Sequence, residues 1–347
     1  MTHAATEYPH FKRKLALLSI CWALVTTSMM LVVSVTALVG NMLAEDKSLV
    51  ALPVALQFIA TALSTVPASF LMKWIGRRNG FLVAAFLLMS GAVTAIAAIY
   101  LNLFWLYCVA CALIGAAAAF SWYYRFAAAE AVPESYRSRA ISLVLAGGIL
   151  AAIFGPTLAR YSKDMLEPLL FAGSFVSIVL LQLVVMAVLA FVDTPKLTGQ
   201  ELKGGRPLRE IARQPKFRIA VAGGVIAYSV MVLLMSVTPL AMEMCGLTFS
   251  QATHVIQWHV LGMFVPAFFT GHLIKRFGVL PIMTLGVVAN LGCVIVAASG
   301  QSFANFWVSL FLVGVGWNFL YTGATTLLTE TYTPAERAKT QALNEFL

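Results

Sequence analysis

The charged residues of this chain that could do chemistry come at the ends of long apolar runs and return at matched positions. Arg125 lies near the end of one such run, and Glu130 follows five residues later. An arginine in such a place is a candidate for binding a solute or an acidic partner. The acidic-then-basic turn after it is repeated 200 positions further on. The matched residues are Glu130 and Glu330, Arg137 and Arg337, and Arg139 and Lys339.

A second segment is repeated at nearly the same spacing. Lys73-Trp-Ile-Gly76-Arg77-Arg78 is matched by Lys275-Arg-Phe-Gly278, 202 positions later. Two motifs that share one spacing favour the duplication of a half of about 200 residues. Chance similarity among apolar sequences is the alternative.

The composition places the chain in lipid. Hydrophobic residues make up 61% of it and charged residues only 11%, whereas soluble domains carry about 25% charge. The net charge of +9 does not indicate nucleic acid binding, because the basic residues lie in short turns between apolar runs. The five cysteines lie within or beside apolar segments and are interpreted as reduced packing residues, without the second pair that a zinc site needs. Neither a metal nor a cofactor is predicted.

Apolar runs of about 20 residues indicate membrane-spanning helices. Ten are predicted, at 15–43, 49–72, 80–101, 103–129, 138–160, 167–192, 217–244, 250–274, 279–299 and 303–329. An eleventh begins near Ala335. The repeat spacing then predicts two spans beyond residue 338, so we expect the sequence to be part of a protein of about 400 residues with twelve helices.

Basic residues in short loops predict the orientation of the helices. A cytoplasmic N-terminus places nineteen lysines and arginines on the inner side and three on the outer side. The hydrophilic segment 194–215 is interpreted as a cytoplasmic linker, with a short surface helix near Pro207 to Arg213, between an N-terminal half at 1–193 and an incomplete C-terminal half at 216–347.

This plan resembles the major facilitator superfamily, a 6+6 helix bundle whose halves are related by an axis along the membrane normal. In that family the loop after the second helix reads G-x-x-x-D-R/K-x-G-R-R/K. Gly76, Arg77 and Arg78 match this pattern, while Ser69, Lys73 and Trp74 depart from it. The resemblance implies that the arginines hold the cytoplasmic side closed, but the missing aspartate leaves the family's usual charge relay in question.

Gly155 and Pro156 partly resemble the G-x-x-x-G-P element of drug–proton antiporters in the same superfamily. A proline there kinks the helix, and a glycine permits close helix approach. A kinked and packed helix without a transport role is the alternative interpretation.

Coupling to protons needs a titrating group within the membrane. All fourteen acidic residues are predicted to fall in loops, tails or helix ends, which leaves His259, about 14 Å deep, as the candidate proton carrier. A core histidine is the alternative. Arg125, about 7–8 Å deep, is predicted to bind solute or to serve the gate, although it could also reach the interface. Its spacing from Glu130 is unfavourable for direct pairing.

Polar and aromatic residues at mid-depth predict where a solute binds. Trp317 and Tyr321 share one face of a helix with Asn318 beside them, and Gln257 lies on another helix. Such surfaces suit a planar or amphipathic solute.

No motif of a membrane-embedded enzyme is present. We therefore expect a monomeric secondary active transporter in the inner membrane of a bacterium, moving a small organic solute by alternating access, with proton-coupled export as an antiporter. Uptake of a nutrient or vitamin such as riboflavin, or a non-transporting receptor-like role, remains open. The expected partners are the solute, the lipid bilayer and protons, with no nucleic acid.

Overall fold

The computed structural model describes residues 11–193 and 205–347, and in these ranges the regular structure is helical without strands. The helices are α2 (Phe11–Leu43), α3 (Leu52–Ile75), α4 (Arg77–Leu101), α5 (Phe104–Ser121), α6 (Tyr124–Glu130), α7 (Arg137–Ala146), α8 (Gly148–Ser162), α9 (Ala172–Ala190), α10 (Leu208–Arg213), α11 (Pro215–Met244), α12 (Phe249–Phe264), α13 (Ala267–Phe277), α14 (Val279–Ala298), α15 (Phe303–Thr329) and α16 (Arg337–Phe346), with short 3₁₀ turns at Lys47–Leu49 and Glu134–Tyr136.

Nine helical segments in the described ranges are long and apolar enough to cross a membrane. They correspond to nine of the ten predicted spans. The short helix expected near Pro207 is α10, and the helix expected from Ala335 is α16. Large side chains such as Phe58, Leu63 and Ile295 are more than half exposed on the outside of the bundle, which is where lipid would replace water as the solvent.

The predicted span 250–274 was wrong in one respect, because it is broken into α12 and α13 at Val265 and Pro266. Proline lacks the N–H that a continuous helix needs and its ring crowds the preceding turn. Two other predicted spans are also interrupted. The break between α5 and α6 lies at Trp122 and Tyr123, and α7 gives way to α8 at Gly147.

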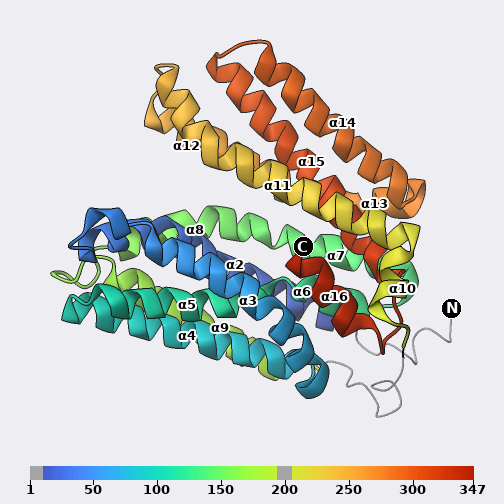
Figure 1. Cartoon of the computed structure of the whole chain (residues 1–347), viewed down its shortest axis with the longest axis horizontal. Helices are drawn as coiled ribbons and strands as arrows, with labels where there is room; N and C mark the ends of the chain where they lie inside the picture. Colours follow the sequence, from blue (N-terminus) through green and yellow to red (C-terminus); the bar gives the residue numbers. More distant parts are fainter. Residues whose placement is uncertain (1–10, 194–204) are drawn as a thin grey trace.

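The helices form two bundles (Figure 1). The N-terminal bundle contains α2 to α9, and the C-terminal bundle contains α11 to α15, with α11, α12 and α14 all packed on α15. The last helix, α16, follows α15 in the chain and is counted here with the C-terminal bundle, although it crosses over and packs against α3 of the N-terminal bundle. Figure 1 shows the bundles close together at the end that carries α10 and diverging towards the other end. We call the α10 end the linker end.

Both repeated loop motifs form the same backbone turn at the linker end. Gly76 ends α3 with φ 86° and ψ 161°, and Gly278 ends α13 with φ 91° and ψ 164°. Side chains other than hydrogen rarely tolerate a positive φ of this kind. The match in backbone geometry supports the duplication inferred from the sequence.

The bundles touch through backbone as well as side chains at the linker end. Ser69 donates a hydrogen bond to the carbonyl of Ala338 at 2.8 Å, and Ser138 donates to the carbonyl of Gly271 at 3.1 Å. A β-carbon on Gly271 would lie 2.6 Å from the α-carbon of Arg139. The close approach of α7 and α13 therefore requires glycine at position 271.

We expect Gly271→Val to force the bundles apart at the linker end, because the added side chain meets backbone. Overpacking of this kind costs about 1–3 kcal/mol. In a cysteine-free background, maleimide labelling of Ser69→Cys should become at least about fivefold faster. Gly224→Val is the matched control, since a β-carbon there meets nothing within 4 Å. Equal labelling rates in the two variants would contradict a tight junction at Gly271.

Candidate functional site

A carboxylate shared by both bundles is at the centre of the linker end. Glu130, the last residue of α6, accepts hydrogen bonds from Arg77 at 2.7 and 3.1 Å and from Arg337 at 3.0 Å. Gln341 donates to the same carboxylate at 3.3 Å and also accepts a bond from Arg77. Arg77 and Glu130 belong to the N-terminal bundle, whereas Arg337 and Gln341 belong to α16. We call these four residues the linker-end network.

The network is largely shielded from water. The side chains of Arg77, Arg337 and Glu130 are 4%, 11% and 18% exposed. Charge-assisted bonds from two arginines compensate the burial of one carboxylate, whereas removing a partner would leave an uncompensated charge.

Among the other charged residues of the repeated motifs, Arg78, Arg137 and Glu330 make their polar contacts within one bundle. Arg78 donates to the carbonyl of Ala190, the last residue of α9, at 3.1 Å. Arg137 pairs with the exposed Glu134 at 3.6 Å, and Glu330 pairs with Lys216 at 2.7 Å. Arg139 lies over the ring of Tyr136 and against Gly271. The two copies of the turn therefore differ, because Arg337 reaches across the bundles and Arg137 does not.

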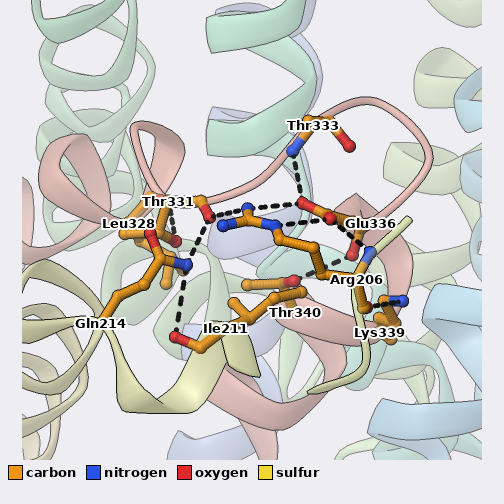
Figure 2. A network of polar contacts seen from close by, with 9 residues as sticks. All are labelled: Arg206, Ile211, Gln214, Leu328, Thr331, Thr333, Glu336, Lys339 and Thr340. Carbon is orange, nitrogen blue, oxygen red and sulfur yellow. Dashed lines mark hydrogen bonds and ion pairs between the residues drawn. The ribbon is translucent and has the colours of Figure 1, made fainter. Parts of the chain in front are cut away.

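A second polar network fixes the segment before α10 to the start of α16 (Figure 2). The carboxylate of Glu336, 1% exposed, accepts bonds from the Arg206 backbone N–H at 2.6 Å and from its guanidinium at 2.8 and 2.9 Å. Thr333 N–H donates to the same carboxylate at 2.9 Å. Lys339 and Gln214 add bonds to the carbonyls of Arg206 and Thr331.

Hydrogen bonds from Arg206 hold the pKa of the Glu336 carboxyl well below its usual value of 4.5. A carboxyl whose folded pKa is depressed stabilises the fold above its unfolded pKa, and that stability is lost as the pH falls through the folded value. The contact between Arg206 and Glu336 is therefore fully present at neutral pH and is retained in mild acid.

We expect Glu336→Gln to lower the melting temperature by a few degrees and to speed amide exchange in α10. The difference from wild type should stay constant between about pH 8 and about pH 5 and narrow only in stronger acid. Glu134→Gln is the control, because that side chain is 83% exposed. A difference that disappears already near neutral pH would contradict a carboxylate with a depressed pKa.

Aromatic rings from both bundles meet between α6 and α15. Trp317 stacks on Tyr321 with ring centroids 4.6 Å apart, and Tyr321 lies 6.5 Å from Trp122. Trp122 in turn lies 6.3 Å from Trp22 of α2 and 5.6 Å from Tyr228 of α11. We call these five residues the aromatic cluster.

A buried ion pair lies beside the aromatic cluster. Arg125 of α6 and Glu345 of α16 are 2.5 Å apart, with side chains 3% and 6% exposed. Arg125 also donates to the hydroxyl of Tyr321 and lies 4.3 Å from the centre of its ring. Arg125 therefore points into the junction of the bundles, not towards the membrane interface, and it does not pair with Glu130.

Glu345 lies at a helix end, as predicted, but the sequence did not predict that its side chain is buried, 6% exposed. Nothing in the sequence of a segment as short as α16 indicated that its last turn would be buried. The signal lay in spacing, because Arg337, Gln341 and Glu345 follow one another at i, i+4 and i+8 and so share one helix face. That face points at the N-terminal bundle, where all three make polar contacts.

Three of the predicted site residues are not part of the aromatic cluster. They are Asn318, His259 and Gln257. Asn318 is fully buried, donates to the carbonyl of Met263 and accepts from Thr270, both at 2.6 Å, and so braces the break between α12 and α13. The Nδ1 atom of His259 is 2.8 Å from the carbonyl of Leu310 within the same bundle. Gln257 is exposed.

Gly155 permits close packing of α8 on α2. A β-carbon at this position would lie 2.6 Å from the β-carbon of Met30. Pro156 follows within α8, but its side chain is not among those that the structure describes.

Three buried donors at the aromatic cluster have no hydrogen-bond partner among the described residues. They are the indole N–H groups of Trp22 and Trp317 and the Nε–H of Arg125. Unpaired buried donors are costly, so such groups at a site commonly serve a ligand or water. Sequence reasoning identified Arg125, Trp317 and Tyr321 but missed Trp22, Tyr228 and Glu345.

Comparisons with known proteins identify the family to which this architecture belongs. Residues 16–347 match the family model described as Major Facilitator Superfamily. The chain is 41% identical, over 99% of its length and 87% of the relative's, to the riboflavin transporter RfnT of Brucella anthropi. It is 27% identical to the uncharacterized MFS-type transporter YddS of Bacillus subtilis, over 89% of this chain and 76% of that protein.

Solved structures share the fold at low sequence identity. The transporter FucP in its outward conformation gives a TM-score of 0.80 at 18% identity, covering 96% of this chain and 87% of that one. A bacterial homologue of the iron transporter ferroportin, in its outward-facing state, gives 0.72 at 15% identity and covers 96% and 89%. With the family match over nearly all of its length, this chain belongs to the Major Facilitator Superfamily.

Proposed function

We propose that this protein carries a planar, acceptor-rich heteroaromatic solute of the riboflavin kind across the inner membrane of a bacterium by alternating access. The observation that carries the proposal is the aromatic cluster, to which both bundles contribute rings and unpaired donors. Flat aromatic side chains stack on a planar ring, and buried N–H groups bind its carbonyl oxygens and ring nitrogens.

The similarity to a riboflavin transporter supports this solute class. Riboflavin is a fused planar ring with carbonyl and ring-nitrogen acceptors, which complements the three unpaired donors at Trp22, Trp317 and Arg125. The hypothesis of drug export depended on Gly155 and Pro156. Close packing against Met30 accounts for Gly155 without drug export, and we propose uptake as the direction.

Alternating access requires the two halves, 1–193 and 216–347, to move as bodies joined by the 194–215 linker. The excess of lysine and arginine on one side supports a cytoplasmic linker end. We propose that the linker-end network is the cytoplasmic gate, because Glu130 binds one arginine from each bundle. The gate is closed in this arrangement, so the solute would enter from the other side.

We expect Arg77→Ala to open the gate and Arg78→Ala to leave it closed. Arg77 joins Glu130 to Gln341 of the opposite bundle, whereas the bond of Arg78 to Ala190 stays within one bundle. Loss of a buried charge partner is worth about 3–5 kcal/mol. Cysteine accessibility from the cytoplasmic face should therefore rise strongly in the first variant only. Equal accessibility in both would mean that these arginines merely set topology.

Binding of riboflavin to the purified protein tests the solute class. We expect saturable quenching of riboflavin fluorescence, and Trp317→Phe should weaken binding about fivefold to tenfold, because one donor is lost while the ring remains. Trp105→Phe is the control, since Trp105 is 64% exposed on α5. Failure of the wild-type protein to bind riboflavin would refute the proposal.

Direction is measured separately in proteoliposomes of known orientation. Riboflavin loaded outside should accumulate inside when the linker end faces the lumen. Accumulation only in the opposite orientation would identify an exporter.

A further inference from the structure

The ion pair between Arg125 and Glu345 differs from the other ion pairs in the described residues. It is the one pair in which both side chains are less than a tenth exposed, and its members come from opposite bundles. Any motion that separates α16 from α6 at this depth must therefore separate two charges that water does not reach.

Few other groups can take over the charge of Glu345. Asn344 donates to its carboxylate at 2.6 Å. The titratable groups that interact with it electrostatically are Arg125 of α6, Tyr123 at the break between α5 and α6, and Tyr228 of α11. Among these, Arg125 is the one cation. Once Arg125 is engaged elsewhere, a buried Glu345 is best stabilised by a proton.

Arg125 lies where a solute would meet it. Its guanidinium contacts the ring and hydroxyl of Tyr321, and its Nε–H is unpaired among the described residues. A solute acceptor bound in the aromatic cluster therefore competes with Glu345 for the same guanidinium.

We propose that Glu345 is the coupling carboxylate of this transporter: an acceptor group of the solute replaces Glu345 on Arg125, and Glu345 takes up one proton from solvent. This inference rests on the proposed function. The solute and the proton bind together, so an inward proton gradient drives uptake.

The sign of the pH dependence follows from linkage. Without solute, the pair with Arg125 favours the ionised carboxylate of Glu345. With solute on Arg125, the unpaired and buried carboxyl binds a proton more tightly. Solute affinity therefore rises as the pH falls, by up to about tenfold per pH unit for one proton.

His259 is not placed to do this. Its Nδ1 contact is the carbonyl of Leu310 in its own bundle, so a change in its charge alters no described contact between the bundles. We therefore move the coupling role from His259 to Glu345.

Calorimetry of riboflavin binding in buffers of different ionisation enthalpy directly measures how many protons the protein takes up on binding. We expect wild type and His259→Gln to take up close to one proton per riboflavin, and Glu345→Gln to bind riboflavin with no proton uptake and no pH dependence. Riboflavin binding by the wild-type protein without proton uptake would overturn the inference and leave the proposed function intact.

A second measurement needs no solute. Infrared difference spectra of Arg125→Gln should show a protonated carboxylic acid near neutral pH, which is absent from Arg125→Gln/Glu345→Gln and from Arg125→Lys. Should Arg125→Gln fail to fold, acid titration of the wild type with and without riboflavin replaces it: the carboxylic acid band that is missing in Glu345→Gln should appear at higher pH when riboflavin is bound. If no carboxylic acid band depends on Glu345, the inference about coupling is wrong, whether or not riboflavin is the solute.

Discussion

The structure depends on one carboxylate that neither bundle could keep buried by itself. Glu130 lies at the end of α6 and accepts bonds from Arg77 in its own bundle and from Arg337 in the other. In a medium where water cannot solvate charges, such a group binds its partners firmly or not at all. The approach of Ser69 to Ala338 and of Ser138 to Gly271 occurs at the same end of the molecule. The closed linker end is thus a polar junction between two apolar bodies.

Hydropathy and charge placed most helices correctly because both properties act on whole segments. Lipid imposes a minimum length on each apolar run and confines most charges to the turns. The matched glycines at 76 and 278 were also readable, since a turn with positive φ restricts the residue type. The break at Pro266 could have been expected from the proline, whereas the break at Trp122 depends on tertiary contacts such as that of Tyr123 with Thr65.

The candidate site was only partly visible in the sequence. Arg125, Trp317 and Tyr321 were identified from depth and residue type, and the structure brings them together. Asn318 has the same predicted depth and is also polar, but it donates its hydrogen bond within its own bundle. A sequence pattern alone does not distinguish such a residue from one that faces the solute. Glu345 was missed because burial of a carboxylate depends on a partner 220 positions away. A sequence repeat shows which residues the two halves share. Here the residues that bear on the candidate site are those that differ between the two halves.

The contact of Arg206 with Glu336 has a mechanical consequence. It attaches the segment before α10 to the residue that precedes α16, so the covalent tether between the bundles shortens to the chain between Asp193 and Gly205. That stretch spans at most about 40 Å when fully extended. A short tether keeps the separated faces at a high effective concentration. Bodies that separate at the linker end, as the proposed alternating access requires, would meet again in the same register.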